Sequence, residues 1–224
     1  INHFKKNEMK IDNSAHGKAK SSKEGEKLKK LFSSLSSSNY QSQLPNETDE
    51  TKKLIKDYIN EGALGIGLPV GYYLGATAGE IFEIYKLAKA LNVTVYTHTR
   101  GFGMPGIQEA MAAASTSGAS VHIVHANSMS LGEIETTLSM VNSAQNNGLD
   151  ITTEVYPYTA ASTSLESILF DEGWKETLNI NYNNLQWEDT GERLNEKTFY
   201  KYRKKGGVVI IHMMKPEWIK IGVS

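Results

Sequence analysis

Two histidines each end a short apolar run in the middle of the chain, and imidazole is a common zinc ligand in proteins. His98 ends the run VTVYTH, and His125 ends the run VHIVH. If the two runs are neighbouring parallel strands, both rings lie at the carboxyl rim of a sheet, where α/β folds bind their ligands. The pair is therefore a candidate metal site. Two structural histidines held by hydrogen bonds are the alternative interpretation.

Alternation along a strand predicts the direction in which each side chain points. His98 shares a face with Tyr96. His125 shares a face with Ile123, and His122 is expected to point the opposite way, toward the helices. We therefore expect the rings of His98 and His125 to project into a common cavity.

The segments around the histidines alternate between strand and helix patterns, as in an array of parallel strands joined by right-handed crossovers. Period-two alternation predicts the strands, and apolar spacings of three and four predict the helices. The expected strands are residues 63–68, 93–98, 121–125 and 150–156. The expected helices are residues 46–61, 80–91, 107–117 and 130–147. Ser130 and Glu133 are expected to cap the last of these helices.

Beyond residue 170 the pattern is less regular. Residues 170–195 form an aromatic-rich excursion without a clear period, and a segment of this length is expected to cover the site like a lid. A helix over residues 195–205 and a strand over residues 208–212 are expected to follow. That strand also ends in a histidine, His212, for which we expect a substrate-side or structural role.

Composition restricts the class of protein. The 224 residues are 39% hydrophobic and 22% charged, which suits one globular domain over residues 45–224, while the Lys- and Ser-rich residues 1–44 are expected to be disordered. A net charge of -1 gives no reason to expect nucleic acid or a membrane surface as a partner. The chain has no cysteine, which excludes thiolate zinc ligands and fits a reducing compartment, so a cytoplasmic location is expected.

Several ordered segments resemble the D-aminoacylase branch of the amidohydrolase superfamily. They are EGALGIG at 61–67, YTHTR at 96–100, HIVHANS at 122–128 and DITTEVYPYTAAS at 150–162. Two later segments, WEDTGERL at 187–194 and VVIIH at 208–212, resemble the N-acyl-D-glutamate deacylases of that branch. The resemblance extends from about Asp57 to about Pro216.

The resemblance implies an α/β fold, namely the middle to late strands of a (β/α)8 TIM-type barrel. It implies a metal-dependent hydrolase that cleaves the amide bond of a small N-acyl-D-amino acid, with D-glutamate favoured, and that uses one or two zinc ions. His98 and His125 are the implied metal ligands. The other ligands and the general-base aspartate of the family are expected outside this chain, so no catalytic residue is assigned within it. Without the missing barrel half, we expect the chain to be an inactive fragment.

Five further residues are candidates for the site. Arg100 is expected to bind a substrate carboxylate as a bidentate fork, through two parallel N–H groups of its guanidinium, unless it pairs with a glutamate of the chain itself. By resemblance, Tyr156 and Ser162 meet the acyl amide or the carboxylate of the substrate. Asn127 stands where some relatives carry a substrate-binding lysine, and its amide can still donate to an oxygen. Glu154 is expected to be buried, and either to orient a metal-bound histidine or to make a structural hydrogen bond.

Two other classes of function stay open at this point. One is a non-catalytic remnant or binding protein that keeps the pocket strands of an amidohydrolase without its metal. The other is a cyclic amidase, such as a relative of dihydroorotase. That class would share the histidines but is not expected to carry the segment YPY at 156–158.

Overall fold

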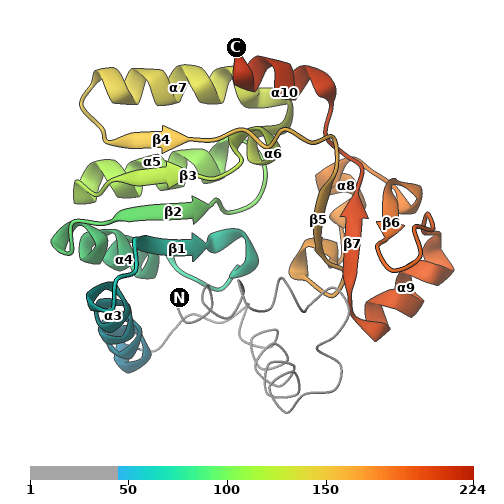
Figure 1. Ribbon diagram of the computed structural model, residues 1–224, viewed down its shortest axis with the longest axis horizontal. Coiled ribbons are helices and arrows are strands. Elements are labelled where there is room, and N and C mark those ends of the chain that lie inside the picture. The colour runs from blue at the N-terminus through green and yellow to red at the C-terminus, as the bar shows by residue number, and fades with distance from the viewer. Residues whose placement is uncertain (1–44) are drawn as a thin grey trace.

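The computed structural model describes residues 45–224, so the disorder expected for residues 1–44 lies outside the described part of the chain. Two sheets, one parallel and one antiparallel, organise residues 45–224 (Figure 1). The parallel strands point toward the antiparallel sheet, so their carboxyl ends lie between the two sheets. This arrangement places the predicted ligand-binding rim at the centre of the molecule.

Four parallel strands form the first sheet in sequence order. They are β1 (Gly65–Pro69), β2 (Thr94–His98), β3 (Val121–Ile123) and β4 (Ile151–Thr153). Each connection between them passes through a helix, which is the α/β arrangement that the sequence predicts. β1 and β4 are the outermost of the four, so this sheet stays open within residues 45–224 and no closed barrel forms there.

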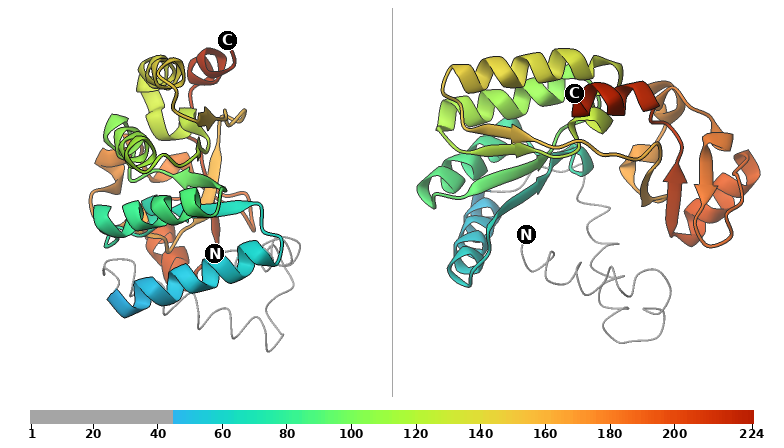
Figure 2. Two further views of the ribbon diagram at one scale, coloured as in Figure 1. Left: turned by 90° about the vertical axis from the view of Figure 1, so that its left-hand side faces the viewer. Right: turned by 45° about the horizontal axis from the view of Figure 1, so that its top comes forward.

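Helices α4, α5 and α7 cover one face of the parallel sheet, as Figure 2 shows, and α3 packs beside α4. Their bounds are α3 (Pro45–Asn60), α4 (Ala78–Ala90), α5 (Met104–Ser117) and α7 (Ile134–Asn146). The strand residues in one register row, Val95, Val121 and Ile151, are each at most 2% exposed and form the core with these helices. Burial of this apolar row fixes which face the helices cover.

The opposite face of the parallel sheet carries a polar and aromatic row. Tyr96, His122 and Thr152 are register partners on β2, β3 and β4. His122 Nδ1 lies 2.8 Å from Thr152 Oγ1, and the His122 and Tyr96 ring centroids are 5.4 Å apart. The prediction that His122 points toward the helices is therefore wrong. Ile123, which is 0% exposed, packs in the core with the helices instead. β3 ends at Ile123, so the alternation of the strand does not extend to His125.

The short segment between β3 and α7 comprises α6 (Ala126–Ser130) and η3 (Leu131–Glu133). The expected capping of the following helix by Ser130 and Glu133 is wrong. Ser130 Oγ donates to Thr137 Oγ1 at 2.8 Å, and Glu133 Oε2 accepts from the Met104 backbone N–H at 3.2 Å. Glu133 thus satisfies a free N–H group at the start of α5.

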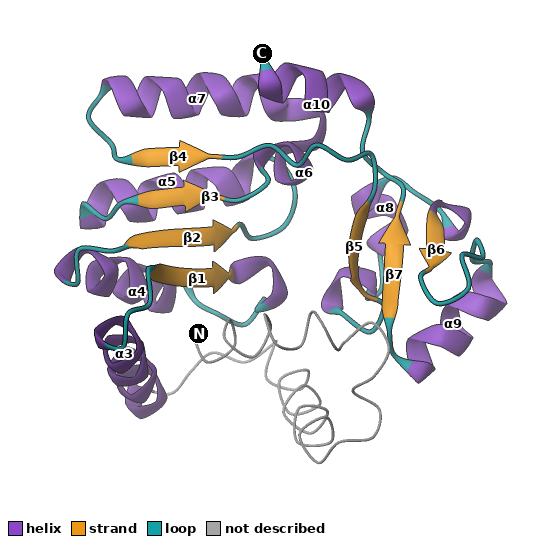
Figure 3. Ribbon diagram, viewed as in Figure 1, coloured by secondary structure: helices purple, strands orange, loops and turns teal. Residues whose placement is uncertain are grey.

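The second sheet is antiparallel, with strand order β5-β7-β6 (Figure 3). Its strands are β5 (Ala161–Ser164), β6 (Leu185–Trp187) and β7 (Val208–Ile211). The helical segments around it are η4 (Ile168–Phe170), α8 (Trp174–Leu178), η5 (Tyr182–Asn184) and α9 (Glu196–Lys205). The predicted helix at 195–205 and strand at 208–212 correspond to α9 and β7, whereas β5 and β6 are not foreseen from the sequence.

Aromatic side chains build a second core beneath this sheet, separate from the core of the parallel sheet. The Trp187 and Tyr202 rings stack at 4.4 Å, and the Trp174 and Phe199 rings stack at 5.3 Å. The segment expected to act as a lid therefore contributes its aromatic residues to a packed core. Phe102, in the loop after β2, packs against both cores and joins them.

After β7 the chain returns to the parallel sheet, where α10 (Pro216–Val223) packs beside α6 and α7 (Figure 1). Within the described residues, no helix combines the length and the hydropathy that crossing a membrane requires.

Candidate active site

A cavity of about 270 Å³ lies between the carboxyl ends of the parallel strands and the antiparallel sheet. Residues from both sheets and from the loops after β1 and β2 contribute to its wall. The lining includes Tyr72, His98, Phe102, His125, Tyr156, Ser162, Thr163, Leu169 and Met213.

His98 and His125 both line the cavity, and their ring centroids are 4.8 Å apart with the ring planes at 78°. His98 is the last residue of β2, as expected from its position in the sequence. His125 comes two residues after the end of β3 and reaches the cavity through a left-handed backbone conformation, with φ 37° and ψ 55°. The two imidazoles therefore converge, although the strand alternation used to predict this does not apply to His125.

The loop after β1 also depends on a close approach to His98. A Cβ atom added to Gly71 would lie 2.6 Å from His98 Nδ1 and 2.7 Å from the carbonyl oxygen of Thr99. Only glycine permits this approach, which brings the 3-10 turn η2 (Val70–Tyr72) against the ring. The Tyr72 and His98 ring centroids are consequently 4.9 Å apart.

Both imidazoles are held in the neutral form at neutral pH. Burial, and then the neighbouring His125, lower the pKa of His98 to about 4, and burial lowers the pKa of His125. His98 Nδ1 lies 3.2 Å from the Thr99 carbonyl oxygen, so it carries the proton and leaves the Nε2 lone pair free. His125 Nδ1 is buried and has no hydrogen-bond partner. Neutral imidazole nitrogens without partners are the donors that a metal ion needs.

This low pKa predicts a pH-dependent stability. The pKa of His98 is about 4 in the folded chain and about 6.5 in the unfolded chain, so between these values the unfolded chain binds more protons. The contribution of neutral His98 to the free energy of unfolding should therefore be complete above about pH 6.5. The free energy of unfolding should fall by up to about 3 kcal/mol as the pH drops toward 4. Urea unfolding in the presence of a chelator measures this. His98→Gln should have a shallower slope in this window, and an equal slope would contradict the prediction.

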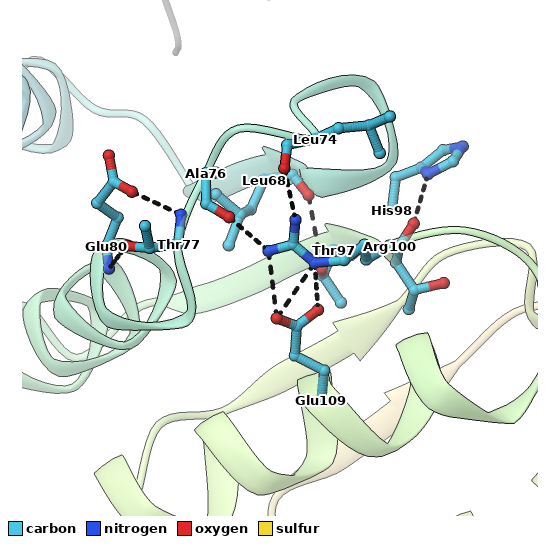
Figure 4. A network of polar contacts seen from close by, with 10 residues as sticks. Leu68, Leu74, Ala76, Thr77, Glu80, Thr97, His98, Arg100 and Glu109 are labelled. Atoms are coloured by element: carbon cyan, nitrogen blue, oxygen red, sulfur yellow. Dashed lines mark hydrogen bonds and ion pairs between the residues drawn. The ribbon is translucent and has the colours of Figure 1, made fainter. Parts of the chain in front are cut away.

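Arg100 does not line the cavity, because its guanidinium is bound within the chain (Figure 4). Nε lies 3.0 Å from Glu109 Oε2, and Nη2 lies 3.2 Å from Glu109 Oε1. Nη1 donates to the Leu74 carbonyl at 3.3 Å, and Nη2 donates to the Ala76 carbonyl at 2.7 Å. The arrangement matches the alternative of an arginine paired with a glutamate. It fastens the loop after β1, which carries Tyr72, to helix α5.

We expect Arg100→Gln to lower the free energy of unfolding by about 2 kcal/mol, because it leaves the Glu109 carboxylate and two carbonyls without their charged donor. Urea denaturation measures the loss, and Arg100→Gln/Glu109→Gln should recover part of it. The control is Arg193→Gln, since Arg193 is exposed and its hydrogen bonds to the carbonyls of Asn184 and Asn183 are long, at 3.4 and 3.5 Å. Equal stabilities of the Arg100 and Arg193 variants would count against the network.

Asn127 and Tyr156 are brought together, but not as two substrate ligands. The Asn127 side chain is 0% exposed. Its Nδ2 donates to the Tyr156 carbonyl at 2.9 Å, and its Oδ1 accepts from the Tyr156 N–H at 2.8 Å. The amide is thus bound to the backbone, whereas the Tyr156 ring lines the cavity and contacts the ring of Tyr158 at 5.2 Å.

The other predicted site residues lie in three different environments. Ser162 is on β5 and lines the cavity opposite the parallel strands. The Glu154 side chain is 56% exposed, so the expectation that it is buried is wrong; it accepts from the His125 N–H at 3.3 Å and lies 3.7 Å from His122 Nε2. His212 lies outside the cavity wall, with Nε2 2.8 Å from Gln186 Oε1, in a structural role.

The loop at residues 69–77, which the sequence leads one to expect in the pocket wall, contributes Tyr72 to the cavity, whereas other lining residues are missed by reasoning from the sequence. Tyr72 Oη lies 3.1 Å from Thr163 Oγ1, which links the loop after β1 to β5 across the cavity. Phe102, Leu169 and Met213 add apolar surface to the wall. Tyr72 follows the end of β1, so the strand-end signal that identifies His98 also points to it. The residues of η4, β5 and β7 give no such signal, because their sheet is not predicted.

The two imidazoles fit a metal ion as two of its ligands. They are neutral and adjacent, and the buried His125 Nδ1 has no other partner. Among residues 45–224, no group of three or more His, Cys, Asp or Glu side chains is arranged to hold a metal. Catalytic zinc sites normally use three protein ligands, and the described residues offer two candidates, His98 and His125.

The fold is shared with solved amidohydrolase structures. A D-aminoacylase structure described as defining a novel subset of amidohydrolases matches with a TM-score of 0.63 and 20% identity, over 81% of this chain and 41% of that chain. N-acyl-D-glutamate deacylase from Bordetella bronchiseptica, solved with zinc and a phosphonate mimic of the tetrahedral intermediate, matches with a TM-score of 0.66 and 18% identity, over the same shares. A further D-aminoacylase structure addresses a binuclear metal centre.

These matches confirm the fold relationship that the sequence motifs suggest, and the chain spans about two fifths of the length of the structures it matches, 41% in each case. No protein-family model matches the chain, and no curated protein matches it. What this chain shares with these structures is thus the fold, an α/β arrangement around a parallel sheet. Two of the structures that share it are a D-aminoacylase and an N-acyl-D-glutamate deacylase.

Proposed function

We propose that the chain is part of a zinc-dependent amidohydrolase that removes the acyl group from N-acyl-D-amino acids. The observation that carries the proposal is the pair of neutral imidazoles, His98 and His125, at 4.8 Å in a cavity at the carboxyl rim of parallel strands. The four parallel strands would be consecutive strands of a (β/α)8 barrel whose remaining part lies outside residues 45–224. The D-amino-acid class comes from the solved deacylases that share the fold.

In this proposal His98 Nε2 and His125 Nδ1 hold the metal. Zinc, when bound, would supply a Lewis acid for the amide carbonyl and a water of lowered pKa. Tyr156 and Ser162 line the same cavity, and their hydroxyl groups would donate to the acyl or carboxylate oxygens of the ligand. The link between Tyr72 and Thr163 holds the two walls of the cavity together.

The lining of the cavity bears on the side chain of the substrate. Phe102, Leu169 and Met213 offer an apolar surface in the cavity, whereas the guanidinium of Arg100 is bound to Glu109. The preference for D-glutamate therefore rests on sequence resemblance, and the apolar wall favours an apolar group. N-acetyl-D-glutamate and N-acetyl-D-leucine are the pair of compounds that decides between them.

We further propose that the chain alone binds such ligands without hydrolysing them, because its described residues supply two ligands and a catalytic zinc site normally uses three. The test is a titration of the purified 224-residue chain, with Zn²⁺ present, against the D and L forms of both N-acetyl amino acids. Chemical shift changes report binding, and released acetate reports hydrolysis. We expect the D forms to shift the signals of Tyr156 and Ser162, and to bind with an affinity at least about tenfold higher than that of the L forms.

His98→Ala is the matched control and should remove the D preference. Failure of all four compounds to bind would contradict the proposed function. Binding of D and L forms with equal affinity, unchanged in His98→Ala, would favour the alternative of a binding protein derived from an amidohydrolase. Zinc-dependent acetate release would support the reaction and would contradict the proposal that the chain is inactive alone.

A further inference from the structure

The segments that follow β3 and β4 stay side by side after both strands have ended. The last register pair of the two strands is Ile123 with Thr153. Beyond it, the Ala126 N–H donates to the Glu154 carbonyl at 2.9 Å, and the His125 N–H donates to the Glu154 carboxylate at 3.3 Å. The chain therefore keeps a ladder of contacts past the point at which the regular strands end.

Asn127 completes this ladder with its side chain. A carboxamide has one carbonyl acceptor and an N–H donor, the same pair of groups as a peptide unit. Asn127 uses both groups on a single residue, donating to the Tyr156 carbonyl at 2.9 Å and accepting from the Tyr156 N–H at 2.8 Å. Both backbone groups of Tyr156 are thereby satisfied where no strand is available to satisfy them.

We propose that Asn127 is a positioning residue whose carboxamide takes the place of a peptide group between the two segments and so fixes the Tyr156 ring on the wall of the cavity that contains His125. With 0% exposure, its amide meets the backbone of the chain and no ligand. The same ladder holds His125 in its left-handed conformation, which is unusual for a residue other than glycine. The claim that this placement serves ligand binding rests on the proposed function, whereas the positioning of Tyr156 by the two hydrogen bonds from Asn127 does not.

The experiment uses the full chain labelled with 3-fluorotyrosine, without metal or ligand, and Tyr156→Phe identifies the Tyr156 signal. Asn127→Ser is too short to bridge the segments, so we expect the Tyr156 fluorine signal to move and its backbone amide to exchange at least about tenfold faster. Asn127→Asp keeps the acceptor for the Tyr156 N–H and loses the donor, so a smaller change is expected. Asn147→Ser is the control, because Asn147 bonds to the Ser143 carbonyl at the exposed end of α7.

A merely structural role for Asn127 would lower the stability and leave the Tyr156 signals of the folded chain unchanged, and that result would overturn the proposal. If Asn127→Ser does not fold, the same signals in Asn127→Asp decide the question. A double-mutant cycle of Asn127→Ser and Tyr156→Phe on the affinity for N-acetyl-D-leucine and N-acetyl-D-glutamate adds a separate readout, in which coupling between the two positions is expected. Failure of all four N-acetyl amino acids to bind would contradict the proposed function, while the fluorine and exchange measurements would still decide whether Asn127 positions Tyr156.

Discussion

Replacing both His98 and His125 with alanine is expected to abolish saturable Zn²⁺ binding by the chain. Each single replacement should weaken binding by more than about tenfold, because an ion held by two imidazoles then keeps only one of them. The physical basis is the convergence of the rings, with centroids 4.8 Å apart and a buried His125 Nδ1 that has no other partner. Competition with a chromophoric chelator at neutral pH measures the affinity.

Two controls separate this site from other histidines. His212→Ala should bind zinc as the parent chain does, because His212 lies outside the cavity wall and contacts Gln186. His3→Ala/His16→Ala tests the contribution of the amino-terminal residues and should also leave the affinity unchanged. Tight binding that persists without His98 and His125, or that disappears with the controls, would show that the ion is bound elsewhere.

Trp187→Ala is expected to lower the free energy of unfolding by about 4 kcal/mol, among the largest effects of a single core replacement. Trp187 is 1% exposed and lies in the second core, where its ring stacks on Tyr202 at 4.4 Å and Lys205 Nζ lies 5.2 Å from the ring centroid. Removing the indole leaves a cavity in the second core, which has few other side chains that could move to fill it. Urea denaturation measures the total loss.

Amide hydrogen exchange locates that loss within the chain. Because the two cores are separate, the amide of Val209 on β7 should lose more protection in Trp187→Ala than the amide of Val95 on β2. Trp187→Phe, which retains an aromatic ring, should show a smaller change at both positions. Equal loss at both sheets would show that the chain unfolds as one unit and that the second core has no stability of its own.

The parallel half of the fold follows from the sequence, because its strands and helices have the periods that packing on one face requires. Val95 is buried against helices where period-two alternation predicts a buried position. The antiparallel sheet could not be predicted in the same way. β5 has the sequence ASTS, and β6 has only three residues, so neither carries a pattern that distinguishes a strand from a loop.

The candidate site shows the same division. His98 is placed by its position at the end of a strand, which is a local property. Arg100 has the right type and position for a carboxylate ligand, yet its partners Glu109, Leu74 and Ala76 come from two other segments that only the folded chain brings together. Asn127 likewise meets Tyr156 across a gap in sequence. Residue type predicts which chemistry is available, and tertiary contacts determine whether the group is free to use it.

A zinc titration of the chain labelled with ¹³C-histidine tests most directly whether His98 and His125 share one metal ion. The signals of the histidine rings in NMR spectra report the binding. The ring signals of His98 and His125 should change together and reach completion at one equivalent of Zn²⁺, while those of His122 and His212 stay unchanged. If the His98 and His125 signals do not respond, or respond at different zinc concentrations, the two imidazoles do not share an ion and the proposed chemistry is wrong.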